Sequence, residues 1–307
     1  MKKIAVIGCG ISGLSSALLL AKDGNEVTIV AKDLTPNTTS NKAAAFWSPY
    51  YANGDRVTRW SRESFLEYEK LCSVPASGIS MTELRRYHKK GTPESEDWTE
   101  AVPNKKFRSL TKEELPQDYD EGFSLEVPLI ETQIFLPYLI NELKIAGGKI
   151  LQREVNHVEE LFPEYQLIIN CSGMGARTLV NDEAMIPVKG QIVFVDLHLK
   201  IPIILDEHAP TYIVQRKDGC IVGGTREENV FTETVEEETL QNIIDRAAVF
   251  FPEIKSAKRI TEWAGLRPYR NEVRVEREQN IIHNYGHGGS GFTLAWGCAN
   301  EVLKLVK

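Results

Sequence analysis

Three glycines near the start of the chain have the spacing of a phosphate-binding turn. The apolar, β-prone run from Ile4 to Ile7 leads directly into Gly8-x-Gly10-x-x-Gly13, and residues with helical spacing follow. In such a turn the first glycine permits a tight bend, the second lets the backbone approach a diphosphate, and the third lets the helix pack against the strand. The N-terminus of the helix presents free N–H groups and a partial positive charge to the anion. Because the motif lies between a strand and a helix, we interpret it as a dinucleotide site and not as a plain structural turn.

A second glycine-dense stretch lies near the other end of the chain. The sequence predicts a strand over 280–284, a loop from Tyr285 to Ser290 and Gly291 that is rich in glycine, and a terminal helix. This loop is either an elaborate helix cap or a second cradle for the same ligand. Two cradles so far apart suit FAD, which has a long ribityl chain and a three-ring head, better than a nicotinamide dinucleotide. A helix N-terminus beside the rings would also stabilise negative charge on a reduced flavin.

The end of the second predicted strand, Glu26–Ala31, gives weaker information about the ligand. Dinucleotide sites place an acidic residue there to bind the adenine ribose. Here Ala31 is followed by Lys32 and Asp33, so the fingerprint is imperfect, although Asp33 is close enough in sequence to serve.

Hydrophobic periodicity predicts alternating helices and strands, which is typical of an α/β protein. The expected helices cover 62–71, 135–146 and 235–251, and the further strands cover 149–155, 166–170, 190–199 and 212–224, the last with a turn at 216–219. Residues 72–128 are rich in Pro, Glu, Lys and Ser and suggest a surface-rich lobe for substrate. No linker separates two domains, so a second lobe must be interleaved with the first.

Composition excludes several classes of function. The 307 residues carry a net charge of −7, which argues against non-specific binding to nucleic acid or to anionic membranes. The five cysteines are scattered without CxxC spacing, so we expect buried thiols and no disulfide frame or metal site. The first strand starts at the N-terminus and no apolar run approaches membrane-spanning length, which leads us to expect a cytoplasmic protein.

Several blocks together resemble the D-amino-acid oxidase and D-aspartate oxidase family of flavoproteins. The blocks are Gly8-x-Gly10-x-x-Gly13, Leu34-Thr35-Pro36-x-Thr38-Thr39, Ala43-Ala44-x-x-Trp47-x-Pro49-Tyr50, Ile169-Asn170-Cys171-Ser172-Gly173, Tyr212-Ile213, Gly223-Gly224-Thr225, Gly265-Leu266-Arg267-Pro268-x-Arg270 and His283-Asn284-Tyr285-Gly286-His287-Gly288-Gly289-x-Gly291. The last two are the most specific. The resemblance implies a Rossmann-like FAD-binding domain formed by 1–56, 130–182 and 259–307, interleaved with a β-rich substrate-binding domain formed by 57–129 and 183–258.

The resemblance also implies a reaction and a cofactor site. FAD would be bound non-covalently, hydride would pass from the Cα of a D-amino acid to flavin N5, and O2 would reoxidise the flavin with release of H2O2. The imino acid would hydrolyse to a 2-oxo acid and ammonia. The implied flavin-binding residues are Gly8, Gly10, Ile11, Ser12, Gly13, Lys32, Asp33, Thr38, Thr39, Ala44, Ala45, Phe46, Val155, Ser172, Gly288, Gly289, Ser290, Gly291, Phe292 and Thr293.

Three residues are implied to act on the substrate itself. A carboxylate is best bound by a planar, permanently charged guanidinium, and Arg267 matches the family's carboxylate clamp. Tyr212 would donate its hydroxyl to the same carboxylate, and the Gly289 carbonyl would accept the substrate amine. The simpler interpretations are a structural ion pair for Arg267 and a core position for Tyr212. His287 is expected to order the backbone only, so no general base is assigned.

The residues around the substrate side chain depart from the family pattern. His208 stands where typical D-amino-acid oxidases carry a second tyrosine, and Ser48 stands beside Trp47 where they carry glutamine. Arg226 matches the D-aspartate oxidase pattern, so it either binds an acidic substrate or is a surface arginine beside Glu227 and Glu228.

Other functions remain open from the sequence alone. A glycine- or sarcosine-oxidase-like amine oxidase shares the flavin fold, and a flavin-dependent dehydrogenase or redox sensor would use another electron acceptor. Residues 51–129 match the family least, and a homo-oligomer is possible.

Overall fold

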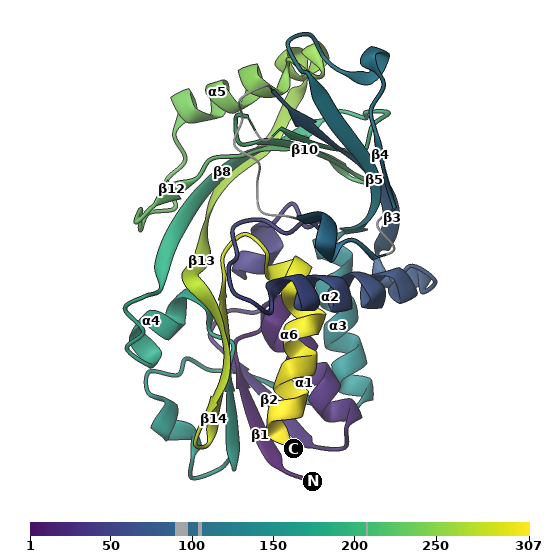
Figure 1. Ribbon diagram of the computed structural model, residues 1–307. Helices are drawn as coiled ribbons and strands as arrows, with labels where there is room; N and C mark the ends of the chain where they lie inside the picture. The colour runs from purple at the N-terminus through teal and green to yellow at the C-terminus, as the bar shows by residue number, and fades with distance from the viewer. Residues whose placement is uncertain (90–97, 104–105, 207) are drawn as a thin grey trace.

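One continuous β-sheet runs through the computed structural model and joins two differently built halves (Figure 1). The structure describes residues 1–89, 98–103, 106–206 and 208–307; the remaining residues, which fall in the segments expected to form the substrate lobe, lie outside the described residues. The order of strands along the sheet is β4-β5-β3-β9-β10-β11-β8-β13-β14-β7-β1-β2-β6, with β12 paired to β8.

The lower half in Figure 1 is a parallel sheet. Its strands are β1 (Lys3–Ile7), β2 (Glu26–Ala31), β6 (Lys149–Gln152), β7 (Leu167–Asn170) and β14 (Ile281–His287). Helices α1 (Ile11–Lys22), α3 (Thr132–Ile145) and α6 (Gly291–Val306) pack on one face, α2 (Val57–Leu71) crosses α6, and the short α4 (Ala176–Leu179) lies on the opposite side. Apolar side chains of these strands and helices form the largest buried cluster, which fixes where each strand ends.

The upper half is largely antiparallel and is bent over the lower half (Figure 1). Its strands are β3 (Ile79–His88), β4 (Phe107–Ser109), β5 (Glu121–Ile130), β8 (Ile186–Asp196), β9 (Ile203–Asp206), β10 (Thr211–Arg216), β11 (Gly219–Gly223) and β12 (Glu227–Glu228). Helix α5 (Glu237–Ala247) covers the outer face, because Leu240, Ile243, Ile244 and Ala247 recur at helical spacing and are buried.

The long strand β13 (Lys258–Glu278) belongs to both halves. Its first part pairs with β8 and its last part pairs with β14. A register shift between Tyr269 and Arg274 marks the change. Residues of β13 near this register shift therefore have neighbouring strands in both halves.

The α/β class expected from the sequence is confirmed, whereas several predicted boundaries were wrong. The helix predicted to begin at residue 62 begins at Val57, and the helix predicted over 235–251 covers only Glu237–Ala247. Strand β14 continues to His287, three residues beyond its predicted end, because it pairs with β13 up to that residue. The predicted turn at 216–219 is confirmed between β10 and β11.

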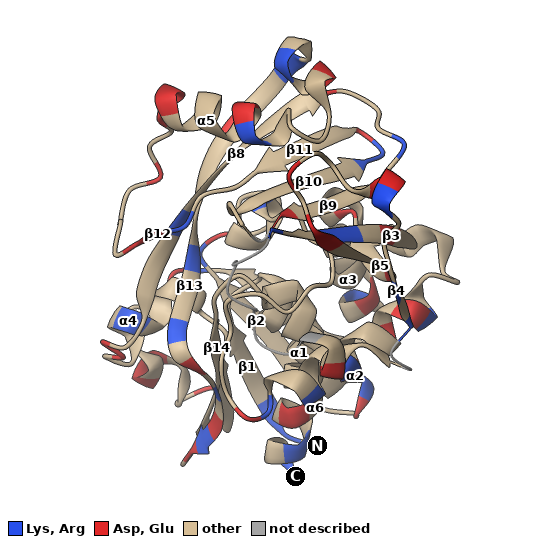
Figure 2. Cartoon of the chain, turned by 45° about the horizontal axis from the view of Figure 1, so that its top comes forward, with Lys and Arg blue, Asp and Glu red and all other residues tan. Residues whose placement is uncertain are grey.

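Charge is mixed over the surface. Basic and acidic residues are interspersed along β13, and α5 carries mainly acidic ones (Figure 2). Across the described ranges, no helix combines the length and the apolarity needed to cross a membrane.

Helices α2 and α6 approach closely at Gly297. The hydroxyl of Ser64 in α2 accepts hydrogen bonds from the backbone N–H groups of Trp296 (3.1 Å) and Gly297 (3.0 Å). A Cβ on Gly297 would overlap backbone atoms of Trp60. This crossing holds the N-terminal end of α6 against the rest of the lower half.

We therefore expect Gly297→Ala to lower the free energy of unfolding by about 3 kcal/mol, because the helices must separate to admit the methyl group. Denaturant titration with the helical circular dichroism signal measures this change. Gly175→Ala is the control, since its Cβ would come no closer than 3.4 Å to Ser172. Equal stability of the two variants would contradict the close packing of α2 on α6.

Candidate active site

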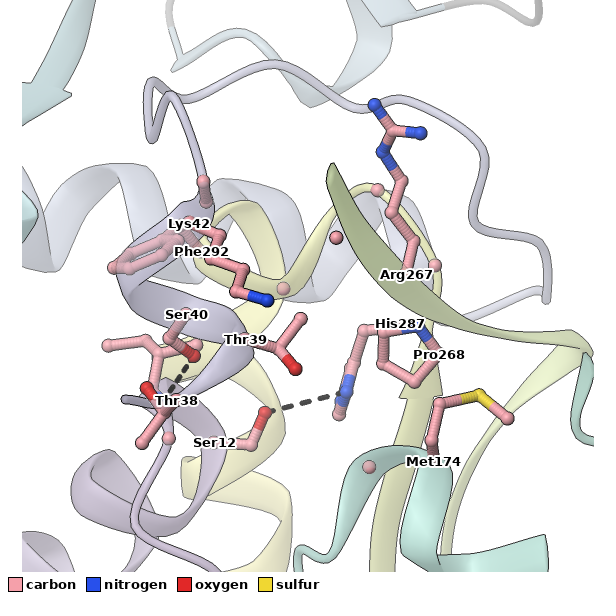
Figure 3. Close-up of a pocket in the computed structure, with 18 of the residues that line it drawn as sticks. Ser12, Thr38, Thr39, Ser40, Lys42, Met174, Arg267, Pro268, His287 and Phe292 are labelled. Carbon is pink, nitrogen blue, oxygen red and sulfur yellow. Dashed lines mark hydrogen bonds between the residues drawn. The ribbon is translucent and has the colours of Figure 1, made fainter. Parts of the chain in front are cut away.

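A cavity of about 1750 Å³ lies between the two halves (Figure 3). The predicted residues that line it are Gly8, Gly10, Ile11, Ser12, Lys32, Asp33, Thr38, Thr39, Ala44, Ala45, Phe46, Ser48, Val155, Ser172, Tyr212, Arg226, Arg267, Gly288, Gly289, Gly291, Phe292 and Thr293. Residues that are up to 285 positions apart in the chain thus share one space.

Four predicted residues do not line the cavity. Gly13 packs against the Gly8 carbonyl, and the Ser290 hydroxyl is bonded to the backbone of Tyr50. Trp47 is buried in the core, where its indole N–H donates to the Ser61 carbonyl at 2.8 Å. His208 is exposed in the turn after β9. The structure therefore does not bring Trp47 or His208 to the cavity that the other predicted residues line, because both lie outside the strands, Trp47 packed into the core beside α2 and His208 on an exposed turn.

The first glycine turn has the shape of a diphosphate cradle. Gly8 has a φ of +101°, and a Cβ there would lie 2.5 Å from the Cys171 carbonyl oxygen. Gly10 is the N-cap of α1 and has no side chain that could cap the first-turn N–H groups. The Ser40 hydroxyl accepts from the N–H of Ile11 at 2.9 Å. An anion bound here would meet the remaining N–H groups and the positive end of the helix.

The second cradle is shorter than the sequence predicts, because Tyr285, Gly286 and His287 belong to β14. The turn that remains begins at Gly288, whose φ is +54° and whose missing side chain makes room for the Tyr51 carbonyl. Ser290 is the N-cap of α6, yet its hydroxyl bonds Tyr50 and not the helix. The first turn of α6 therefore presents uncapped N–H groups along the cavity wall, as a flavin ring that gains negative charge requires.

The end of β2 supplies a carboxylate to the cavity. Asp33 lines it, while the neighbouring Lys32 is paired with Glu154 at 2.8 Å, both side chains being exposed. Asp33 is thus the available acceptor for a ribose hydroxyl, and the fit of the cavity to FAD rests on this carboxylate together with the two helix ends.

Arg267 and Tyr212 form a cationic group at the upper wall. The Arg267 guanidinium lies over Gly190, where a Cβ would overlap it, and donates to the Thr225 carbonyl at 2.9 Å. No carboxylate of the described residues lies within 4.0 Å of it. Burial raises the pKa of Tyr212, and the nearby charge and hydrogen bond of Arg267 oppose that rise. The phenol therefore remains a hydrogen-bond donor beside a cation that lacks an ion-pair partner among those residues, which is a site for a carboxylate.

Arg226 has a different environment. Its side chain is 47% exposed, lies 3.9 Å from a Glu228 carboxylate oxygen and is placed over the Tyr51 ring at 4.8 Å. Tyr51 is itself hydrogen-bonded to Glu228 and stacked on Tyr269 at 4.3 Å. The Arg226 guanidinium therefore already contacts Glu228 and Tyr51 at the edge of the cavity.

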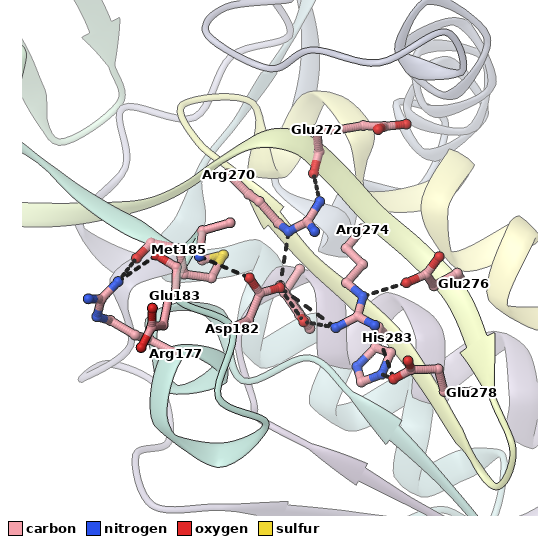
Figure 4. Close-up of polar contacts among 12 residues, drawn as sticks. Arg177, Asp182, Glu183, Met185, Arg270, Glu272, Arg274, Glu276, Glu278 and His283 are labelled. Atoms are coloured by element: carbon pink, nitrogen blue, oxygen red, sulfur yellow. Dashed lines mark hydrogen bonds and ion pairs between the residues drawn. The ribbon is translucent and has the colours of Figure 1, made fainter.

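A polar network supports the site from below (Figure 4). Asp182 accepts from the Tyr285 hydroxyl at 2.8 Å and from Arg270 at 3.0 Å, and Arg274 donates to the same hydroxyl at 2.8 Å. These contacts lock β13 to β14 at the register shift, two residues after Pro268. Arg270 and Tyr285 belong to the two most specific sequence blocks, whereas Asp182 and Arg274 have no local signal, and only the fold brings the three segments together.

Two further lining residues, Tyr51 and Arg86, also have no motif in the sequence. Tyr51 follows directly after Tyr50, and Arg86 is the second residue of an Arg-Arg pair inside β3. Arg86 precedes Tyr87, and both are buried in a strand most of whose other residues are partly exposed, so the Arg-Arg pair itself is the only local feature that marks Arg86.

The family comparison decides what kind of protein has this cavity. The model of the family described as FAD dependent oxidoreductase matches residues 3–305. The chain belongs to this family.

Relatives of this oxidoreductase agree with the resemblance stated from the sequence, which is confirmed. The D-amino-acid oxidase of Dictyostelium discoideum is 36% identical over 99% of this chain and 91% of that protein. The D-amino-acid oxidase of Rubrobacter xylanophilus is 38% identical over 99% of this chain and 95% of that protein. The glycine oxidase of Bacillus cereus, 21% identical, has the same fold, with a TM-score of 0.83 over 100% of this chain and 97% of that chain.

His287 gives a test of the site in this oxidoreductase. Its ring is 4% exposed, with Nε2 3.0 Å from the Asn284 amide oxygen and Nδ1 3.4 Å from the Ser12 hydroxyl (Figure 3). Burial lowers the pKa of His287 from 6.5 to about 4, so the imidazole is neutral in the folded protein at neutral pH. A neutral ring that ties β14 to α1 fits the structural role expected from the sequence.

The unfolded chain binds a proton at this ring below about pH 6.5, whereas the folded chain resists it down to about pH 4. Stability contributed by the neutral ring is therefore lost as the pH falls through this window. The free energy of unfolding of the unsubstituted protein should therefore fall between pH 7 and pH 5. In His287→Gln we expect this fall to be smaller by about 1–2 kcal/mol. Denaturant titrations at both pH values measure the difference, and the exposed His208→Gln serves as the control. An unchanged pH dependence in His287→Gln would refute the buried neutral ring.

Proposed function

We propose that this oxidoreductase converts D-amino acids, O2 and water to 2-oxo acids, ammonia and H2O2, with FAD bound non-covalently. The observation that carries the proposal is the guanidinium of Arg267, which shares a cavity with two helix N-termini that their own N-cap residues leave uncapped, and which has no carboxylate within 4.0 Å in the described part of the chain. One end of the cavity suits a diphosphate and a flavin, and the wall above it suits an α-carboxylate.

The cofactor would be held by the two glycine turns and by Asp33, Thr38, Thr39, Val155 and Ser172. The chemistry that bound FAD supplies is acceptance of a hydride equivalent from the substrate Cα and return of the electrons to O2. Asp33 would orient the ribose, while the first turns of α1 and α6 stabilise the diphosphate and the negative charge on the ring.

The protein's own residues would position the substrate. Arg267 binds the α-carboxylate, the Tyr212 hydroxyl donates to the same group, and the Gly289 carbonyl accepts from the amine. These contacts hold two substituents of Cα, the carboxylate and the amine. Enantiomers are then distinguished by the third requirement, that Cα–H faces the cofactor end of the cavity while the side chain points away from it. Catalysis by these residues is therefore chiefly a matter of orientation, and no side chain is assigned as a general base.

Two finer assignments belong to the same proposal. The substrate-binding segments are 57–129 and 183–258, and the cofactor-binding segments are 1–56, 130–182 and 259–307. A preference for acidic D-amino acids is included, because Arg226, which matches the D-aspartate oxidase pattern, lines the cavity.

The first test uses the purified yellow protein without oxygen. D-amino acids are expected to bleach the flavin absorbance, L-amino acids are not, and admission of air is expected to restore the colour with about one H2O2 per flavin reduced. Bleaching by glycine or sarcosine alone would support the amine-oxidase alternative. Restoration of colour without peroxide, through an added artificial acceptor, would support a dehydrogenase.

The second test removes the guanidinium. Arg267→Ala is expected to lower kcat/KM for D-alanine by about 100-fold or more, mostly through KM, because the α-carboxylate loses its charge-assisted hydrogen bonds. Arg267→Lys, which keeps the charge but loses the paired N–H groups, is expected to fall between. The FAD absorbance spectrum checks that each variant retains cofactor. A variant that keeps FAD and full activity would remove Arg267 from the site.

A further inference from the structure

The Arg267 guanidinium is bonded to the backbone of the segment that follows β11. One of its N–H groups donates to the Thr225 carbonyl at 2.9 Å. A guanidinium is planar, so a bond to one N–H group also restricts the directions in which the others point. The orientation of the Thr225 peptide therefore affects how Arg267 presents its remaining donors to the cavity.

Strand pairing does not fix the Thr225 peptide. Strand β11 ends at Gly223 and β12 begins at Glu227, and both strands pair with β8. Thr225 lies in the gap between them. Within a ladder, hydrogen bonds to the neighbouring strand align each peptide, whereas in a gap other groups must satisfy and align it. The alignment of Thr225 thus depends on side chains.

The side chain of Thr225 closes this gap. Its hydroxyl accepts from the backbone N–H of Gln191 in β8 at 3.1 Å and donates to a carboxylate oxygen of Glu227 at 2.9 Å. The Gln191 amide donates to the same Glu227 oxygen at 3.1 Å. Thr225 is therefore held at two points while its carbonyl accepts from Arg267.

The Glu227 carboxylate is itself anchored by a buried cation. The Lys189 ammonium lies 3.7 Å from a carboxylate oxygen of Glu227 and 2.8 Å from one of Glu236, and the Lys189 side chain is 1% exposed. Removing one partner of a buried charge is strongly destabilising, so these three groups are held in one arrangement. The buried Gln191 also accepts from the Glu236 backbone N–H at 2.8 Å, which ties the segment after β12 to β8.

These groups lie behind the cavity and not in it. Gly190 and Ile192 of β8 line the cavity, whereas Lys189 and Gln191, which alternate with them, do not. The latter two share the outer face of the strand with the β8 side chains that pack under α5. The polar cluster therefore reaches the substrate wall through the Thr225 peptide.

We propose that Thr225 and Glu227 are positioning residues for the carboxylate clamp, which orient Arg267 from behind the sheet with Lys189 as their anchor. This inference rests on the proposed function and adds to it the groups that align its substrate-binding guanidinium. Because Arg267 is directed before the substrate arrives, binding a carboxylate costs little side-chain entropy. The network therefore acts on every substrate that has an α-carboxylate, whatever its side chain.

The test separates substrate binding from later steps in the holoenzyme. Thr225→Val removes the hydroxyl but keeps the shape, and is expected to raise KM for D-alanine about 10-fold while kcat changes less than about twofold. Thr225→Ser, which restores the hydroxyl, is expected to stay within about twofold of the unsubstituted enzyme. Thr261→Val, an exposed position on the same strand as Arg267, is the matched control and is expected to leave KM unchanged.

Two further measurements distinguish positioning from a general loss of structure. Butyrate, a carboxylate without the amine, is expected to inhibit D-alanine oxidation about 10-fold more weakly in Thr225→Val, while the dissociation constant of FAD changes less than about twofold. Glu227→Met is expected to reproduce the effect of Thr225→Val. The double variant is expected to lose no more than either single variant, because both substitutions break the same link.

An unchanged KM in Thr225→Val and Glu227→Met overturns the proposal, and so do additive losses in the double variant. Equal weakening of FAD and butyrate binding also overturns it, since that pattern indicates a purely structural role. Glu227→Met carries the test if Thr225→Val does not fold. If the unsubstituted protein oxidises no D-amino acid, the proposed function fails; if D-alanine is oxidised and these contrasts are absent, only the positioning role fails.

Discussion

The pairing of β13 with a different strand at each of its ends is the constraint on which the site depends. Its first part is held by β8, which sets Arg267 opposite Val188, and its last part is held by β14. The Asp182 network closes the join between the two registers. A change of register by one residue would turn Arg267 to the other face of the sheet, so the network, whose Tyr285 also lines the cavity, helps to keep Arg267 facing inward. The direction of the Arg267 side chain therefore depends on the backbone pairing of β13.

Close backbone contacts explain how two helix ends can serve one ligand. Helix α1 follows β1 through a turn in which Gly8 lies against Cys171, and α6 follows β14 through a turn in which Gly288 lies against Tyr51. Neither helix is capped by its own side chain, so both leave polar groups that a ligand must satisfy. In an FAD-dependent oxidoreductase these are the groups expected to meet the diphosphate and the ring.

The arginines of the cavity illustrate why position in the fold outweighs residue type. Arg226 is exposed and adjacent to Glu228, and its charge is screened by water. Arg267 emerges from the inner face of the upper sheet and has no carboxylate within 4.0 Å among the described residues, so an anion beside it would be attracted in a low-dielectric space. The surroundings of each guanidinium, and not its residue type, therefore decide how strongly it would attract an anion.

The sequence by itself determined the β-α-β start, the two glycine turns, the family and the cluster of residues around Arg267, because these depend on short-range spacing that a few adjacent residues encode. Only the tertiary structure decided that Trp47 and His208 do not line the cavity, that β14 extends to His287, and that Arg86 shares a row with Tyr212. The last two depend on which strands become neighbours and in what register, whereas Trp47 and His208 lie outside the strands and are placed by the packing around them. Strand pairing joins residues more than a hundred positions apart, and local sequence patterns do not specify such pairings.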